Sequence, residues 1–580
     1  MNQPLHRRLP LLPLLLLALV AGGCEPPAAT SADLDELMEE EQESRPDAGT
    51  TDAGYPEVSS DLAAERADHA RGFLDRLDEI DPAGLDDEDR TRFARFQETL
   101  EGRILGYEAG THFTPIDHEG GPHSSFMRLT SRTSFDDVED YEEYLVRLRT
   151  APDYLRQYAE LMREGMETGY TRPAAVLGGH QGMIDSYLEV PPEESPLYAP
   201  FHEFPSAVPD QERTRLREEG VAAIEEGAYP ALREFQVFLV EEYIPAARDS
   251  YAISDVPGGR AYYEHMVRSH TTLDITAQEV HDIGLSEVAR IRAEMLEIID
   301  DLEFQGDFDD FVEFLRTDPQ FYVDTPEELI QIASTIAKQV DGLLPQYFHL
   351  KTLPKQPYGV EPVPADLAPN YTGGRYSGSS RDDRAGFYWV NTYNLPSRTL
   401  YTLPALTLHE AVPGHHLQIA TNREMDVGSG GITAFSEGWA LYAEHLGAEM
   451  GIYDDPYSDF GRLTYEMWRA CRLVVDTGVH ALGWSRDEVL DFLASNTALS
   501  LHEVRTETDR YIAVPGQALS YKMGELTIRR LRAEAEEALG DDFDLRDYHH
   551  VVLENGPVPL TVLEENVRSW IMDQRSDSTE

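Results

Sequence analysis

The segment of residues 408–418, LHEAVPGHHLQ, carries a histidine–glutamate pair followed by two further histidines. In zinc peptidases a helix commonly places two histidines four residues apart, so that both rings reach one ion. The glutamate after the first histidine then lies beside the water that the metal activates. Here the fourth position after His409 is Pro413, which has no metal-binding side chain. The second ligand must therefore be His415 or His416, six or seven residues after His409.

The shape of the helix decides between these two histidines. In a straight helix His416 shares a face with His409, but it lies about 10.5 Å further along the axis at about 1.5 Å per residue. Pro413 removes a backbone donor and Gly414 tolerates unusual dihedral angles, so we expect a bulge or local unwinding there. A bulge that absorbs two residues would return His415 to the usual position of the second ligand. We therefore predict that His415 binds the metal, while His416 lies behind the ligands or near the substrate.

A third ligand is expected from the segment FSEGWALYAE, residues 435–444, which is predicted to be a second helix with Glu437 near its start. Two histidines and one glutamate with an open fourth position for water form a catalytic zinc arrangement. We predict one Zn²⁺ per chain, bound by His409, His415 and Glu437, with Glu410 as general base. The ligands suit zinc best without excluding other first-row metals.

Four motifs resemble the DUF885 family, a group of bacterial proteins placed with the thermolysin-like Glu-zincin metallopeptidases. They are HExxPGH at 409–415, EGWALY at 437–442, DTGVH at 476–480 and PGQALSYKxG at 515–524. The resemblance extends over roughly residues 60–575. It implies a largely α-helical fold and a hydrolase, most often called a peptidase, whose substrates are poorly defined.

Further site residues are expected from the later motifs. A metallopeptidase needs a donor that stabilises the oxyanion of the tetrahedral intermediate, and Tyr521 and His480 are the candidates. Arg510 is a candidate clamp for a substrate carboxylate. The aromatic and β-branched run of residues 386–391, which ends at Asn391, predicts a strand that could pair with an extended peptide.

The first residues predict an exported lipoprotein. Two arginines precede a short apolar run, and the small residues AGG then lead directly to Cys24. This pattern is typical of a secretory signal peptide, and the run is too short to span a membrane. It resembles a bacterial lipobox, although Ala21 stands where such boxes usually carry Leu, and plain secretion is the alternative. We expect a signal peptide at 1–23 and a lipidated Cys24 that starts an acidic, flexible tether over 24–60.

Composition limits the remaining possibilities. The chain has 107 acidic against 48 basic residues and a formal net charge of −59, which argues against nucleic-acid binding and against docking of the folded body on an anionic membrane. We therefore expect membrane attachment only through the lipid, at a bacterial membrane and facing the periplasm or the cell surface. Two cysteines, Cys24 and Cys471, cannot form a disulfide framework or a cysteine-rich zinc site.

The rest of the chain is predicted to be helical. Capping boxes, such as Thr276 with Glu279 and Ser485 with Glu488, mark helix starts, and strand patterns are few. The predicted fold is mainly α, with residues 61–580 forming one large metallopeptidase-like body that has a small β-sheet near the active site.

The sequence is compatible with three functions. The leading prediction is a zinc-dependent peptidase that acts on peptides outside the cytoplasm, with a metal-activated water and Glu410 as base. The second keeps the metal but hydrolyses a non-peptide amide or ester. The third is a surface lipoprotein that binds a partner without catalysis. Glu410 argues against the third function, because a structural zinc site is normally closed by four protein ligands and gains nothing from a base. The sequence does not determine the oligomeric state.

Overall fold

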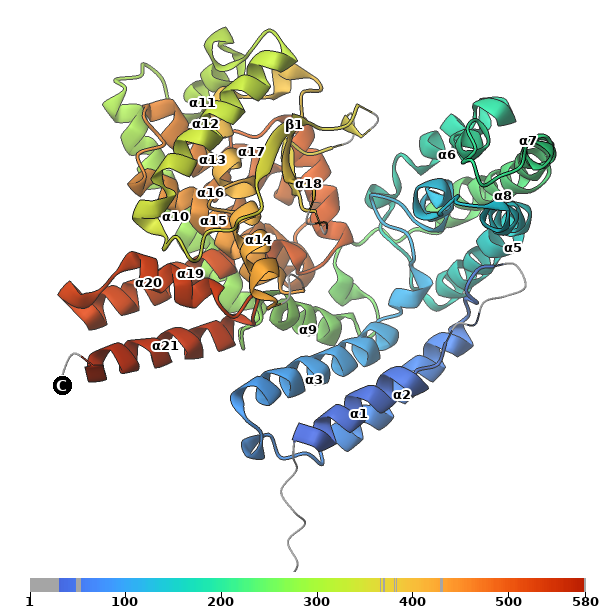
Figure 1. The fold of residues 1–580 in the computed structure, drawn as a ribbon, viewed down its shortest axis with the longest axis horizontal. Helices are drawn as coiled ribbons and strands as arrows, with labels where there is room; N and C mark the ends of the chain where they lie inside the picture. The colour runs from blue at the N-terminus through green and yellow to red at the C-terminus, as the bar shows by residue number, and fades with distance from the viewer. Residues whose placement is uncertain are drawn as a thin grey trace, which may run out of the picture.

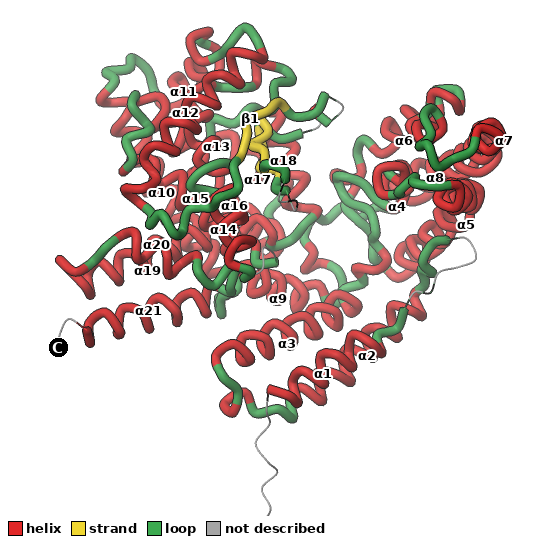
Figure 2. Tube along the Cα trace, viewed as in Figure 1, coloured by secondary structure: helices red, strands yellow, loops and turns green. Residues whose placement is uncertain are grey.

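The computed structural model describes residues 31–577, apart from residues 48, 50–53, 366, 369–370, 380, 382 and 428–430. Nearly all regular elements are helices, and the three strands form one small patch among them (Figure 2). The prediction of a mainly α fold with a small sheet is confirmed. Within the described residues, no helix is both long and apolar enough to cross a membrane.

The amino-terminal part consists of eight helices that extend away from the larger body (Figure 1). The segments directly before and after α8 are π-helical turns, Ile224–Ala228 and Phe238–Tyr243. The helices are α1 Ser31–Ser44, α2 Ser60–Leu77, α3 Asp87–Glu108, α4 Pro122–Met127, α5 Val138–Thr168, α6 His180–Leu188, α7 Asp210–Ala223 and α8 Tyr229–Val237.

The larger body contains the remaining helices and the sheet. Helix α16 is its centre, because it is buried along most of its length and packs against α10, α13, α17, α18 and α19. The elements are α9 Gly259–Thr271, α10 Ala277–Asp301, α11 Phe308–Thr317, α12 Pro326–Tyr347, β1 Tyr358–Pro362, β2 Gly374–Ser377, β3 Gly386–Val390, α13 Leu403–Glu410, α14 His415–Met425, α15 Thr433–Glu449, α16 Pro456–Leu482, α17 Arg486–Asn496, α18 Leu501–Ala513, α19 Ser520–Leu539, α20 Leu545–Leu553 and α21 Leu560–Asp577.

The sheet has the strand order β1–β3–β2, with β1 parallel and β2 antiparallel to β3. Strand β1 packs against α12 and β2 packs against α13, so the sheet lies beside the helix that carries the histidine–glutamate pair. The strand predicted at residues 386–391 is confirmed as β3. The idea that it pairs with a peptide is wrong, because β3 is the central strand and both of its edges are bonded to neighbours.

Local sequence signals explain where several helices begin. Thr276 and Ser485 are N-caps whose side chains accept a hydrogen bond from the backbone N–H of Glu279 and Glu488, and each capping box is reciprocal. These two predicted helix starts are confirmed.

Part of the predicted flexible tether is a helix. Residues 31–44 form α1, where Leu34 and Leu37 are buried in a cluster with side chains of α2 and α3. Glu41 is only 2% exposed and pairs with Arg45 and Arg103. The tether prediction is therefore wrong for this segment, because leucines three residues apart give a helix an apolar stripe although the average composition is polar. The predicted signal peptide and Cys24 lie outside the described residues.

Candidate metal centre

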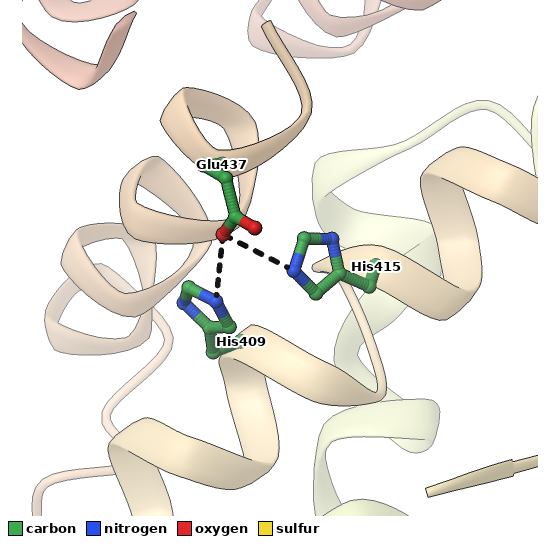
Figure 3. Close-up of side chains that lie close together, drawn as sticks. All are labelled: His409, His415 and Glu437. Atoms are coloured by element: carbon green, nitrogen blue, oxygen red, sulfur yellow. Dashed lines mark ion pairs between the residues drawn. The ribbon is translucent and has the colours of Figure 1, made fainter. Parts of the chain in front are cut away.

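Three side chains from three helices converge at one point. The Nε2 atom of His409 and the Nε2 atom of His415 each lie 3.4 Å from Oε2 of Glu437. Figure 3 shows the two rings and the carboxylate turned toward one another from the end of α13, the start of α14 and the first turns of α15. One ligand atom from each residue lies within 4.8 Å of the others.

The chain makes this convergence possible by ending one helix and starting another. Helix α13 ends at Glu410, and the backbone is non-helical at Ala411 and Gly414 before α14 begins at His415. A Cβ atom at position 414 would lie 1.9 Å from the carbonyl oxygen of His409, so only glycine fits there. The predicted local unwinding is confirmed, and it is a complete break between two helices.

The structure places His415, and not His416, in this group. His416 is buried and turned toward the sheet, where its Nδ1 atom lies 3.0 Å from the hydroxyl of Tyr376. Its ring also packs against Tyr358, at 4.6 Å between the ring centroids. His416 therefore supports the break between the helices from behind, with no ligand atom in the group.

A second carboxylate orients the first histidine. The Nδ1 atom of His409 lies 2.8 Å from Oε1 of Glu444, which is 1% exposed and has Arg469 at 3.6 Å. A carboxylate here accepts a hydrogen bond from Nδ1–H and so keeps the lone pair of Nε2 free for a metal. Sequence reasoning missed Glu444. Its spacing of seven residues from Glu437, which places both carboxylates on one helix face, was the available signal.

The electrostatics of the group favour a cation. Burial opposes protonation of His409, but its bonds with Glu437 and Glu444 outweigh burial and raise its pKa to about 9. Burial would raise the pKa of Glu437, yet the charge of His415 and the bond with His409 hold it well below the usual range. Positive charge is thus stabilised at the position where the three ligand atoms meet.

The two distances from Glu437 are compatible with tetrahedral metal binding. Ligand bonds of about 2.0–2.1 Å to zinc place the ligand atoms about 3.3–3.4 Å apart at tetrahedral angles. The two distances from Glu437 agree with this value. Two imidazoles and one carboxylate make a candidate three-ligand metal group.

Strand β2 holds the glutamate that follows the first ligand. Glu410 is 8% exposed, and its Oε2 atom accepts a hydrogen bond of 2.7 Å from the backbone N–H of Tyr376. Its other carboxylate oxygen makes no hydrogen bond with any described residue. The carboxylate is therefore fixed at one oxygen and available at the other.

Tyr521 lies near the group at the start of α19. Burial raises the pKa of its phenol, and the negative charge of Glu437 adds to this effect. The guanidinium of Arg472 lies 4.4 Å from the centre of its ring. Its hydroxyl makes no hydrogen bond with the described part of the chain, which leaves it able to donate one to a ligand.

The structure does not bring His480 into the group. Its Nδ1 atom accepts a hydrogen bond from the backbone N–H of Ile253, and its Nε2 atom lies 2.9 Å from the carbonyl oxygen of Tyr511. Both ring nitrogens are therefore occupied by backbone groups, and burial lowers the pKa of His480 to about 4. These contacts tie α16 to two neighbouring segments.

Arg510 and Asn391 are also engaged within the protein. Arg510 pairs with Glu507 at 2.7 Å and donates to the side-chain oxygen of Gln517. Asn391 is fully buried, and its amide bonds four backbone groups, those of Ala368, Tyr371, Thr372 and Tyr393. The contacts of Arg510 fix the end of α18. Those of Asn391 hold backbone groups that precede β2 and follow β3.

Comparison with known proteins places the chain in a family. Residues 43–567 match DUF885, described as a bacterial protein of unknown function, and the chain belongs to this family. It is similar to the crystal structure described as "the putative lipoprotein from Colwellia psychrerythraea", with 27% identity, a TM-score of 0.78, and coverage of 90% of this chain and 93% of that one.

A second solved structure shares the fold. It is described as a "putative lipoprotein of unknown function from Shewanella oneidensis", with 17% identity, a TM-score of 0.64, and coverage of 92% of this chain and 97% of that one. None of the curated proteins matches this chain.

Proposed function

We propose that this protein is a zinc-dependent hydrolase that cleaves peptides outside the cytoplasm. The observation that carries the proposal is the convergence of His409, His415 and Glu437 beside a glutamate that a strand holds in place. Metal ligands with an adjacent anchored base and an open position are the parts that metal-assisted hydrolysis requires.

The chain's own residues supply the remaining steps. Zinc, when bound, supplies Lewis acidity and lowers the pKa of water at the site toward neutrality. The free oxygen of Glu410 accepts a proton from the attacking water and later delivers it to the leaving amine. The hydroxyl of Tyr521 donates a hydrogen bond to the carbonyl oxygen as that oxygen becomes negative.

The outer edge of β2 supports a peptide as substrate. The backbone N–H of Tyr376 points away from β3 and bonds Glu410, so this edge of the sheet borders the site. An extended peptide can add to a sheet edge through main-chain hydrogen bonds, which brings its carbonyl groups past the adjacent glutamate. A small ester or a non-peptide amide gains nothing from such an edge.

The test combines metal analysis with cleavage. The chain from residue 31 onward, which keeps α1 on its partners, is purified with and without Glu410→Gln and assayed against a peptide library. We expect one zinc per chain in both proteins and at least about a hundred-fold slower cleavage in the variant. The control Glu424→Gln, at the far end of α14, should cleave normally.

Other outcomes would decide against the proposal. Absence of bound metal from the purified chain would refute the site. Bound zinc with turnover of esters but not of peptides would show that the enzyme cleaves esters instead of peptide bonds. Zinc without any turnover would favour a binding protein.

The proposal includes export and attachment to a bacterial membrane through a lipid on Cys24. The sequence pattern before Cys24 and the descriptions of both similar structures support it. Cys24→Ser should move the protein from the membrane fraction to the soluble fraction of the cell envelope. An unchanged distribution would contradict the lipid anchor.

A further inference from the structure

A cavity of about 230 Å³ lies where the amino-terminal part meets the larger body. Its walls come from the end of α3, the segments that follow α5 and α8, helix α9 and the end of α18. The side chains that matter for its chemistry are Arg172, Arg248, Tyr262 and Asp117. None of these belongs to the metal group.

Both arginines are fixed by carbonyl groups of the backbone. The Nε atom of Arg172 donates to the carbonyl of Ile116 at 2.8 Å, and its Nη1 atom donates to that of Ala513 at 3.0 Å. The Nε atom of Arg248 donates to the carbonyl of Thr171 at 2.9 Å, and its Nη1 atom donates to the carbonyl of Ala252 and to the hydroxyl of Ser250, so Arg248 acts on an anion mainly through its charge. The Nη2 atom of Arg172 makes no hydrogen bond with any described residue, so its donors remain available.

Neither arginine has a carboxylate partner. Among the described residues, neither guanidinium forms an ion pair within 4.0 Å, and the carboxylates of Asp117 and Asp255 act on them only at longer range. Other arginines of this body pair directly, as Arg462 does with Asp459. Asp117 lines the same cavity, but its Oδ1 atom accepts hydrogen bonds from backbone N–H groups of its own turn.

The electrostatic consequence is a local excess of positive charge. Burial lowers the pKa of both arginines, and the charge of Arg172 contributes to lowering that of Arg248 to about 10. Asp117 attracts Arg172 and Asp255 attracts Arg248, but neither carboxylate bonds a guanidinium, and holding two cations close together in a half-buried place is costly. The hydroxyl of Tyr262 also makes no hydrogen bond with a described residue and adds a neutral donor to the wall.

We propose that this cavity is a binding site for a small anion, a carboxylate or a phosphate, held between Arg172 and Arg248. Arginine donors suit the oxygens of both groups. The volume is below the usual range of about 300–1,000 Å³ for sites that bind larger ligands, which favours a compact anion. The site is separate from the proposed metal chemistry and does not depend on it.

The test measures anion binding to the full chain by calorimetry at constant ionic strength. Inorganic phosphate and succinate are titrated separately, with sodium chloride as the reference, so that the two arms distinguish phosphate from carboxylate. We expect saturable binding of one anion per chain, and at least a ten-fold loss of affinity in Arg172→Lys. The control Arg163→Lys, which pairs with Glu242 on the surface of α5, should bind like the parent.

A second variant covers the chance that Arg172→Lys does not fold. Val514→Phe places a larger side chain in the wall and leaves both guanidinium groups with their carbonyl partners. It should abolish binding while the circular dichroism spectrum stays unchanged. The proposal is overturned if neither anion saturates the chain, or if a folded Val514→Phe or Arg172→Lys binds as tightly as the parent.

Discussion

The larger body contains two clusters of buried charge, one on α10, α16 and α19 and the other on α13, α14 and α15, and they differ in the source of their cation. In the first, the Nζ atom of Lys522 lies 2.8 Å from Glu466, 2.8 Å from Glu525 and 3.1 Å from Glu287. In the second, Glu437 meets two imidazoles, and no lysine or arginine among the described residues pairs with it. The first cluster is closed by cations of the chain itself, Lys522 together with Arg290, Arg462 and Arg529, whereas the second is a candidate group for an added ion.

Adjacent residues of α19 serve the two clusters. Lys522 is fully buried in the closed cluster, whereas Tyr521 is near enough to Glu437 for that charge to raise its pKa, and its hydroxyl makes no hydrogen bond with a described residue. The closed cluster holds α10, α16 and α19 together, since its carboxylates come from all three helices. The difference indicates that the first cluster stabilises the packing of three helices, whereas the second is a candidate metal group.

Removing the lysine of the first cluster should have the largest effect of the four variants. Lys522→Met removes the fully buried ammonium that three carboxylates share, and because each carboxylate keeps an arginine partner, the cost is at most the about 3–5 kcal/mol of breaking a buried ion pair. We expect the free energy of unfolding, measured by urea denaturation, to fall by up to this amount. Lys338→Met, at an exposed lysine paired with Asp341, should change it by less than about 1 kcal/mol. A small change in both variants would contradict the structural role of the closed cluster.

The second prediction concerns the neighbour of that lysine. Tyr521→Phe removes one donor to the oxyanion, which lowers kcat by about 10²–10³-fold in comparable enzymes. The metal content and the free energy of unfolding should remain close to those of the parent, because the hydroxyl has no partner among the described residues. Steady-state kinetics on the best library peptide measures the effect. A variant with parental kcat would remove Tyr521 from the mechanism.

The sequence predicted most of the fold, because helix periodicity and capping are local. Thr276 and Ser485 marked helix starts correctly, and the run 386–390 marked the central strand. The strand order could not be predicted from the local sequence, because nothing in that run shows which strands pair with its two edges. Helix α1 was missed because the composition of the segment was averaged, and a stripe as short as Leu34 and Leu37 is diluted by the acidic residues around it.

The grouping of His409, His415 and Glu437 could be predicted because Pro413 and Gly414 indicate a break in the helix, which brings His415 back beside His409. His480 shows the limit of motif reasoning. A histidine within a family motif has the same sequence signature whether it faces a substrate or satisfies two backbone groups, as His480 does. Only the hydrogen-bond partners separate these roles.

A third prediction concerns the stability that added zinc gives to the second cluster. Zinc that binds the folded chain only should stabilise it by about 2.7 kcal/mol when its free concentration is a hundred times the dissociation constant. His415→Ala should lose this gain, whereas His502→Ala, at an exposed position on α18, should keep it. Thermal unfolding with and without zinc measures both. Equal stabilisation of the parent and His415→Ala would place the metal elsewhere.

The smallest expected effect tests the carboxylate behind the first ligand. Glu444→Gln keeps the shape of the side chain but removes the charge that accepts the proton from Nδ1 of His409. Loss of such an orienting partner lowers metal affinity by about 10–100-fold, or about 1.4–2.8 kcal/mol. Competition with a fluorescent chelator measures the dissociation constant. Glu449→Gln, at the end of the same helix and paired with Arg532, is the matched control. If both variants bind zinc like the parent, Glu444 is only a partner for Arg469, and the open cluster needs no second carboxylate to hold its ion.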